Sequence, residues 1–277
     1  MTKIARNRLA EIADRLIAPV LRAGAIEMQH YEAGVEVERK GDASPVTAAD
    51  RDAEAILLAA LADIAPDIPV IAEEAVSEGC VPTIGRTFFL VDPLDGTREF
   101  INKRGEFTVN VALVDNGSPV LGIVYAPAIG ELYATLEPGT ASFARIPSGL
   151  EPRQTSDCPF QTVRVRTPGA KLTAVASRSH KSPETETFLA RYAIGERRDS
   201  GSSLKFCTIA RGEADIYPRL APTMEWDIAA GHAVLAAAGG AVTTPTGEPI
   251  RYGKSETGFR NGFFVAWGAR QPIPALD

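Results

Sequence analysis

The chain has 277 residues, 45% of them hydrophobic and 23% charged, which supports a large buried core and excludes general disorder. The formal net charge of −6 leaves no excess of Lys and Arg for a nucleic-acid surface, although a small phosphorylated ligand could still bind through bridging cations. Three widely separated cysteines lack metal-binding or disulfide spacing, which is typical of idle thiols in a reducing compartment.

The N-terminal segment predicts two helices around one short strand. Residues 3–31 place apolar side chains at helical spacing but carry charges throughout, unlike a signal peptide, and no apolar run approaches membrane-spanning length. We therefore expect a cytoplasmic protein without stable membrane association. Residues 35–40 alternate like a strand. Thr47 is a suitable N-cap for a helix that ends at Pro66, with Asp50 in its first turn.

The middle of the chain predicts strands. Residues 70–75 form a short apolar strand that runs into two glutamates, residues 87–93 form a second strand, and residues 107–127 form a hairpin around Asp-Asn-Gly. Residues 131–136 add another strand. Residues 137–169 are weakly patterned and rich in Pro, Gly, Ser and Thr, so we place the junction between two parts of the chain there.

Beyond this junction, strands and helices alternate, as they do in an α/β protein. The sequence predicts a strand at 172–177, helices at 182–193 and 201–212, a strand at 214–220, a helix at 223–240 and a strand at 262–267. We therefore divide the chain into an N-terminal α+β part, residues 1–160, and a C-terminal α/β part, residues 161–277.

The stretch DPLDGT, which begins at Asp92, follows a buried apolar run. Asp, Pro and Gly are ordinary turn residues, so a tight turn after a strand is the simple interpretation. However, α/β folds bind ligands at the carboxyl ends of strands, and Asp92 and Asp95 lie three residues apart, which could aim both at one point. Such neighbouring carboxylates repel each other unless a hard divalent cation neutralises them.

Further acidic residues follow the same pattern. Glu73 and Glu74 follow a short apolar strand, and Asp227 lies in the first turn of an apolar helix. Taken singly, a Glu pair is usually solvated, and Asp227 would interact favourably with the helix dipole by about 0.3–1 kcal/mol. Taken together, oxygen ligands without nearby His or Cys favour Mg²⁺ over zinc. Converging carboxylates also suit two metals about 3.5–4 Å apart, as in phosphoryl transfer.

DPLDGT, the upstream AEE at 72–74 and EWDIAAGHAVLAAAGG at 225–240 resemble the signature elements of the inositol monophosphatase superfamily of Mg²⁺-dependent, lithium-sensitive phosphatases. The resemblance covers nearly the whole chain, from Lys40 to Gly240 at least. It implies a layered αβαβα sandwich of the inositol monophosphatase and fructose-1,6-bisphosphatase type, which combines α+β and α/β parts with the active site between them.

Within this superfamily, GSSLKFC, ADIYPRL, WDIAAGHAVL and SRSH look more like the CysQ-type 3′(2′),5′-bisphosphate nucleotidases than like inositol monophosphatases. Those enzymes remove the 3′-phosphate of adenosine 3′,5′-bisphosphate, a by-product of sulfate assimilation. The resemblance therefore implies this reaction and, as a second one, removal of the 3′-phosphate from the corresponding phosphosulfate. Ile228 departs from the Thr expected after the Trp-Asp pair, and Met224 lies where it could alter base preference.

The resemblance also implies roles for individual residues. Two or three Mg²⁺ would bind per site, and the implied metal ligands are Glu73, Asp92, the carbonyl of Leu94, Asp95 and Asp227. Thr97 would accept a proton from a metal-activated water that attacks phosphorus in line, and Asp50 would orient Thr97. The simple alternatives are a turn hydroxyl for Thr97 and an N-terminal helix charge for Asp50.

On the substrate side, Lys205 and Arg219 would pair with the second, non-scissile phosphate, and His180 would lie near the base or ribose. As simple alternatives, Lys205 and Arg219 are surface charges, and His180 forms a hydrogen bond within its loop. The full set of implied substrate contacts is Glu73, Leu94, Asp95, Gly96, Thr97, His180, Gly201, Ser202, Lys205, Arg219 and Asp227.

Two other functions stay open at this point. An inositol-1-phosphatase or a sugar bisphosphatase would share the same metal ligands, so that only the pocket around Lys205 and Arg219 distinguishes them from a nucleotidase. A non-catalytic regulator that binds a phosphorylated ligand is the alternative from another class, and the intact set of acidic residues argues against it. The sequence leaves the oligomeric state open.

Overall fold

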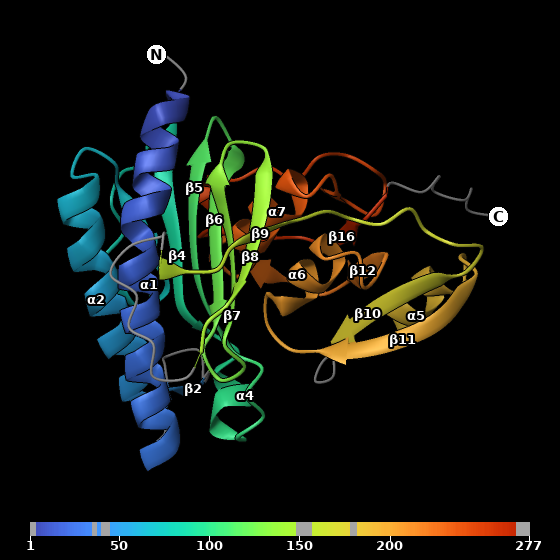
Figure 1. Ribbon diagram of the computed structural model, residues 1–277, viewed down its shortest axis with the longest axis horizontal. Coiled ribbons are helices and arrows are strands. Elements are labelled where there is room, and N and C mark those ends of the chain that lie inside the picture. The colour runs from blue at the N-terminus through green and yellow to red at the C-terminus, as the bar shows by residue number, and fades with distance from the viewer. Residues whose placement is uncertain (1–3, 35–37, 40–44, 148–156, 178–181, 270–277) are drawn as a thin grey trace.

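The computed structural model describes residues 4–34, 38–39, 45–147, 157–177 and 182–269. Helices and sheets alternate in layers (Figure 1). The helices are α1 (Arg6–Ala33), α2 (Ala48–Ile64), α3 (Glu73–Ser77), α4 (Thr97–Ile101), α5 (Pro183–Leu189), α6 (Leu204–Ala210) and α7 (Glu225–Ala237), and a short 3₁₀ helix, η2, spans Ser255–Thr257. Within the described part of the chain, no helix has the length and apolar character needed to cross a membrane.

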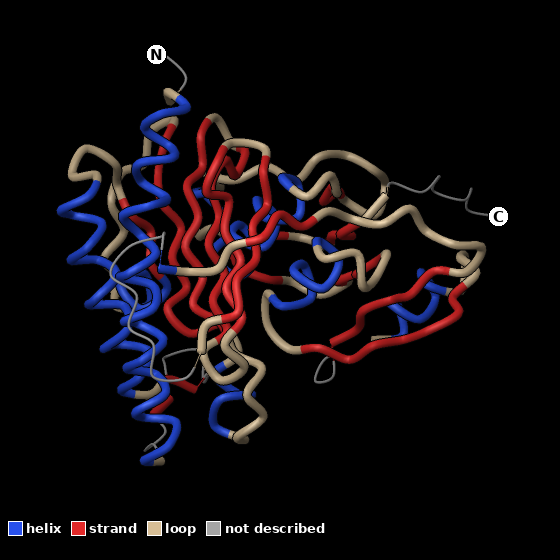
Figure 2. The backbone as a smooth tube through the Cα atoms, in the orientation of Figure 1, coloured by secondary structure: helices blue, strands red, loops and turns tan. Residues whose placement is uncertain are grey.

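The larger sheet has seven strands (Figure 2). Their spatial order is β3 (Val70–Ala72), β4 (Thr87–Asp95), β5 (Thr108–Asp115), β6 (Ser118–Ala126), β7 (Glu131–Glu137), β8 (Thr140–Arg145) and β9 (Gln161–Val163). β3 is parallel to β4, and every later pair is antiparallel. β5 is buried along its whole length because helices cover both faces of the sheet, which explains its nearly continuous apolar sequence.

The smaller sheet has five strands. Their spatial order is β11 (Ile194–Ser200), β10 (Leu172–Ser177), β12 (Ile216–Arg219), β16 (Phe264–Trp267) and β14 (Ala241–Thr243). β10 is parallel to β11 and β12, whereas β16 is antiparallel to both of its neighbours. Two further antiparallel pairs join β1 (Glu38–Arg39) to β2 (Pro45–Val46) and β13 (Thr223–Met224) to β15 (Arg260–Asn261).

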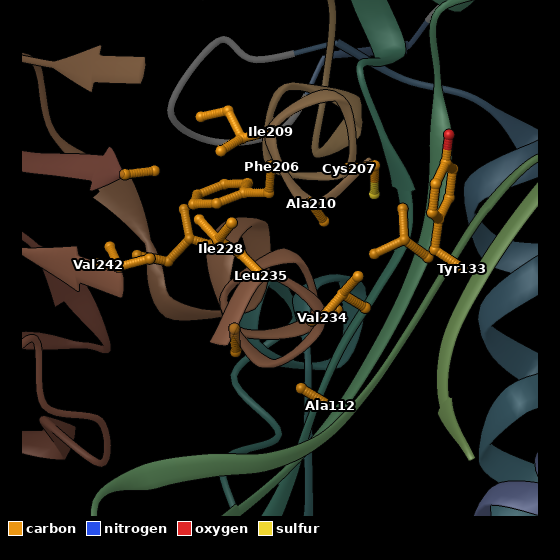
Figure 3. Close-up of a cluster of buried hydrophobic side chains, with 14 of the residues drawn as sticks. Ala112, Tyr133, Phe206, Cys207, Ile209, Ala210, Ile228, Val234, Leu235 and Val242 are labelled. Carbon is orange, nitrogen blue, oxygen red and sulfur yellow. The ribbon is translucent and has the colours of Figure 1, made fainter. Parts of the chain in front are cut away.

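Three apolar clusters separate the layers. One lies between α1, α2 and the larger sheet and includes Leu16 and Leu57. A second surrounds α6 and α7 between the two sheets, with Phe206 at its centre (Figure 3). The third packs α5 against the outer face of the smaller sheet, where Phe188 meets Trp267. The order helix, sheet, helix, sheet, helix confirms the αβαβα sandwich that the resemblance implies.

The strands that the sequence did not predict lie where its pattern is weak or polar. β8 and β9 fall within residues 137–169, and β9 pairs with β8, so the larger sheet extends past residue 160. β11 has the sequence IGERRDS with mostly exposed side chains, as expected of an edge strand that pairs on one side only. The helix predicted at 182–193 ends at Leu189 because the chain turns there into β11. The division into parts at residue 160 stays a prediction.

Candidate metal centre and anion pocket

A pocket of about 300 Å³ lies where the carboxyl end of β4 meets the N-terminal ends of α6 and α7. Its lining comes from both halves of the chain. It includes the predicted residues Glu73, Asp92, Leu94, Asp95, Gly96, Thr97, Gly201, Ser202, Lys205, Arg219 and Asp227. Asp50 does not line the pocket but contacts Thr97, which does, and His180 lies outside the described residues.

The carboxylates of three separate elements converge in this pocket. Glu73 is the first residue of α3, Asp92 lies in β4, and Asp227 lies in the first turn of α7. One carboxylate oxygen from each lies within 4.8 Å of the others. Asp95 lines the same pocket from the end of β4. The structure thus brings together all four acidic residues that were predicted as metal ligands.

The position of Glu73 depends on Glu54, a buried glutamate of α2. The two carboxylate oxygens of Glu54, in α2, each accept a backbone N–H, from Glu74 and from Ala75, at 2.8 Å. These are N–H groups of the first turn of α3, which have no partner inside the helix. Glu54 therefore caps α3 from another helix. For this reason β3 ends at Ala72 and Glu73 begins a helix, whereas the sequence predicted a strand through residue 75.

The turn after Asp92 sets the position of Asp95. The pairing of β4 with β5 becomes irregular between Asp92 and Asp95, and Pro93 has no N–H to donate there. The Leu94 N–H instead donates to Asp92 Oδ1 at 3.1 Å. Gly96 then has a φ of +97°, and a Cβ at that position would lie 3.1 Å from the carbonyl oxygen of Glu106. The left-handed conformation and the lack of space both require glycine.

The electrostatics of the cluster fit a hard divalent cation. Burial, together with the charges of Asp95 and Glu73, raises the pKa of Asp227 well above its usual range. Burial also raises the pKa of Asp95, although the nearby Lys205 opposes this shift. Carboxylates in this arrangement repel one another, and a dication would remove the repulsion. Because the clustered donors are all oxygens, the site suits a hard cation better than zinc.

Asp50 and Thr97 are in contact, as the resemblance implied. Thr97 Oγ1 lies 3.3 Å from Asp50 Oδ1 and 3.4 Å from the carbonyl oxygen of Leu94, and it can donate its single proton to one of them. Asp50 Oδ2 accepts from the Thr47 N–H at 2.8 Å and from the Thr47 hydroxyl at 2.7 Å. Asp50 thus forms the helix-capping box of the simple interpretation and also reaches Thr97 with its other oxygen.

The opposite side of the pocket is cationic. Lys205 is only 6% exposed, and burial lowers its pKa to about 8. Arg219 Nε and Thr223 Oγ1 are buried and have no hydrogen-bond partner among the described residues. Buried donors are nearly always paired in folded proteins, so unpaired donors at a pocket indicate that a ligand supplies the acceptor. Lys205 and Arg219 are therefore not ordinary surface charges.

The turn before α6 lies directly on the loop that follows α4. A Cβ on Gly201 would lie 2.7 Å from the carbonyl oxygen of Glu106, so a larger residue would separate the two segments. Ser202 follows and donates its hydroxyl proton to Asp95 Oδ2 at 2.6 Å. The hydroxyl that was predicted to contact substrate thus hydrogen bonds to a predicted metal ligand.

Sequence reasoning missed several residues of the site. Thr108 and Asn110 lie in β5 on the face that packs against α7, where the next positions are the apolar Ala112 and Val114. Two polar residues at core-facing positions of a buried strand were the signal that could have found them. Thr108 and Asn110 do not line the pocket, and the residues that line it and were not predicted are Arg98, Glu99, Phe206, Tyr217, Thr223 and Ile228.

Known proteins resemble this chain along most of its length. A curated relative from Escherichia coli strain K12, named 3′(2′),5′-bisphosphate nucleotidase CysQ, is 40% identical over 256 residues, covering 91% of this chain and 98% of that protein. A protein of the same name from Salmonella typhimurium is 42% identical over 246 residues, covering 88% and 94%.

Solved structures also resemble this chain along most of its length. CysQ from Bacteroides thetaiotaomicron, described as a bacterial member of the inositol monophosphatase family, matches with a TM-score of 0.75 at 38% identity over 96% of this chain and 98% of that one. An inositol monophosphatase from Thermotoga maritima matches with a TM-score of 0.70 at 25% identity over 90% and 89%.

The layered fold and the acidic cluster define the class of metal-dependent phosphatases. The family model described as the inositol monophosphatase family matches residues 8–267. This chain therefore belongs to the inositol monophosphatase family.

Proposed function

We propose that this protein is a Mg²⁺-dependent 3′(2′),5′-bisphosphate nucleotidase that removes the 3′-phosphate of adenosine 3′,5′-bisphosphate. Relatives at 40–42% identity are named 3′(2′),5′-bisphosphate nucleotidase CysQ. The observation that supports the substrate class is the presence of two anion-binding features in one pocket. The carboxylate cluster would take the scissile phosphate through cations, and Lys205 with Arg219 would take the second phosphate.

A substrate with two phosphates explains the unpaired donors better than a monophosphate does. Arg219 Nε is buried without a partner among the described residues, and Lys205 is almost fully buried. Removing such groups from water is unfavourable unless an anion compensates them. An inositol monophosphate would place its one phosphate at the carboxylate cluster and leave Lys205 and Arg219 without a bound phosphate.

The metal ligands would be the residues that the sequence predicted. Glu73, Asp92 and the carbonyl of Leu94 would hold a first Mg²⁺, and Asp92 would share a second with Asp95 and Asp227. Bound Mg²⁺ would activate a water molecule and neutralise the charge that develops on the phosphate oxygens. The number of cations, two or three, is part of the same proposal.

Thr97 would accept a hydrogen bond from the attacking water, and Asp50 would orient Thr97. Asp50 Oδ2 is held by Thr47, so Asp50 Oδ1 is the oxygen that accepts from Thr97 Oγ1. With its proton directed at Asp50, the Thr97 oxygen presents lone pairs to the pocket and can accept a hydrogen bond from water. Water is the nucleophile in this scheme, so no Ser, Cys or His is required to form a covalent intermediate.

Phosphate release tests the proposal. We would compare adenosine 3′,5′-bisphosphate, its phosphosulfate analogue, adenosine 3′-monophosphate, inositol 1-phosphate and fructose 1,6-bisphosphate with Mg²⁺. We expect the highest kcat/KM for the nucleotides with a second anionic group. Adenosine 3′-monophosphate is the matched control, because it lacks only that group. Preference for inositol 1-phosphate or fructose 1,6-bisphosphate would contradict the assigned substrate. Binding of a nucleotide without release of phosphate would instead indicate the non-catalytic regulator.

A further inference from the structure

Buried polar groups hold one oxygen of Asp95. Ser202 Oγ donates to Asp95 Oδ2 at 2.6 Å, and Asn110 Nδ2 donates to the same oxygen at 3.4 Å. The backbone N–H of Ser203 is shared between this carboxylate and Ser202 Oγ. The two side-chain donors come from different halves of the chain, because Asn110 lies in β5 and Ser202 lies in the turn before α6. Both converge on Oδ2, which leaves Oδ1 as the oxygen for a cation.

The orientation of Asn110 is itself fixed. Thr108 and Asn110 are fully buried, and the Thr108 hydroxyl donates to Asn110 Oδ1 at 3.1 Å. With its oxygen engaged by Thr108, the amide of Asn110 must direct its N–H₂ group toward Asp95. Thr108 lies directly opposite Asp95 in the pairing of β4 with β5. The four side chains therefore form one connected network.

Ser202 has an unfavourable backbone conformation in this network. Its φ of +50° lies in the left-handed region, which a non-glycine residue adopts rarely. The side chain accepts the N–H of Ser203 and donates to Asp95, so the same turn that carries the unusual φ also delivers the hydroxyl to the carboxylate. Such conformations persist where the surrounding contacts hold them, and they cluster at functional sites.

We propose that Asn110 and Ser202 are positioning residues that hold Asp95 Oδ2 so that Asp95 Oδ1 faces the cation. The inference rests on the proposed metal centre. It gives Ser202 a role through Asp95 in place of a direct substrate contact. It also makes the geometry of the cation site depend on contact between the two halves of the chain, because Ser202 and Asp95 come from different halves. Removal of a residue that orients a metal ligand in this way typically weakens metal binding by about 10–100-fold.

Cation affinity, measured without substrate, tests the proposal. Isothermal titration of Mg²⁺ into the full chain would compare the wild type with Asn110→Ala, Ser202→Ala and Ser202→Gly. We expect binding that is weaker by about 10–100-fold in all three variants. Thr208→Ala is the matched control, because the Thr208 hydroxyl donates to the backbone of its own helix, at Leu204, and its affinity should equal that of the wild type.

The two substitutions at Ser202 separate the hydroxyl from the backbone. Glycine accepts a left-handed φ without strain, whereas alanine retains the strain, and both remove the hydroxyl. Equal losses of Mg²⁺ affinity in the two variants would assign the effect to the hydroxyl. In activity assays, the Mg²⁺ concentration for half-maximal rate should rise in parallel, and saturating Mg²⁺ should restore most of kcat.

Unchanged Mg²⁺ affinity in Ser202→Gly and Asn110→Ala would overturn the inference. Thermal melting without cations checks that each variant is folded, and Ser202→Gly decides the question if the buried Asn110→Ala variant does not fold. Asp95→Asn tests the proposed metal centre separately from the positioning roles of Asn110 and Ser202. If Asp95→Asn also binds Mg²⁺ normally, the proposed metal centre is wrong. If it alone loses affinity, the metal centre stands and the positioning roles fail.

Discussion

The charge of Lys205 offers a quantitative test of the anion pocket. Burial lowers its pKa to about 8, against the opposing influence of the carboxylates of Asp95, Glu99 and Glu106. The protonated form is the one that binds a phosphate. About nine-tenths of the free enzyme would hold that form at pH 7 and about one-tenth at pH 9, so affinity for the second phosphate should fall about tenfold between pH 7 and pH 9.

The substitution Lys205→Arg isolates this titration, because a guanidinium stays charged throughout the range. We would measure kcat/KM for adenosine 3′,5′-bisphosphate from pH 6.5 to 9.5 at saturating Mg²⁺ and normalise each enzyme to its value at pH 6.5. The ratio of wild type to Lys205→Arg should be nearly flat below pH 7 and fall by about tenfold between pH 7 and pH 9. Effects of pH on the cations and on water attack cancel in this ratio.

Adenosine 3′-monophosphate is the control substrate, since it has no second phosphate for Lys205 to bind. With this substrate the ratio should stay flat over the whole range. A constant ratio with adenosine 3′,5′-bisphosphate up to pH 9.5 would refute the reasoning. An equal decline with both substrates would show that Lys205 acts on the reaction site and not on the second phosphate.

Three further predictions follow from the same structure. Asp95→Asn should remove nearly all turnover while melting and circular dichroism show a folded protein, and full activity would contradict the assigned metal ligand. Glu27 is fully buried without a hydrogen-bond partner among the described residues, and its pKa lies well above 4.5. Because the pKa of Glu27 is higher in the folded than in the unfolded protein, its protonation contributes fully to the free energy of unfolding below about pH 4.5. This contribution falls by about 1.4 kcal/mol per pH unit as the pH rises toward the folded-state pKa. Glu27→Gln should therefore gain stability relative to wild type in urea denaturation as the pH rises above about 4.5, whereas a constant difference would contradict this. Mg²⁺ at 100 times its Kd should stabilise the wild type by about 2.7 kcal/mol, and Asp227→Asn should lose most of that gain in the same denaturation experiment.

The parts of the site that the sequence predicted are those set by local chemistry. Asp92 and Asp95 follow a buried apolar run within one turn, so their convergence depends on a few residues of backbone. Asp227 belongs to a short motif at the start of a helix, and the resemblance to a family joined it to the others. These features need little knowledge of which strand pairs with which.

The parts that the sequence did not predict depend on contacts between distant segments. Glu54 sets the start of α3 from another helix, so the local strand pattern at 70–75 was misleading. Asn110 faces Asp95 only because β5 pairs with β4 in a particular register. Ser202 reaches Asp95 because the turn before α6 packs on the opposite half of the chain. The spacing of apolar residues along the sequence does not show which distant segments come into contact.

The most direct test of the whole account is a crystal structure of the Thr97→Ala variant with Mn²⁺ and adenosine 3′,5′-bisphosphate. We expect slow turnover in this variant, and the anomalous signal of Mn²⁺ locates the cations. The account predicts Mn²⁺ among Glu73, Asp92, Asp95 and Asp227, with the 3′-phosphate on the cations and the 5′-phosphate on Lys205 and Arg219. Mn²⁺ bound elsewhere, or the 5′-phosphate on the cations, would contradict it.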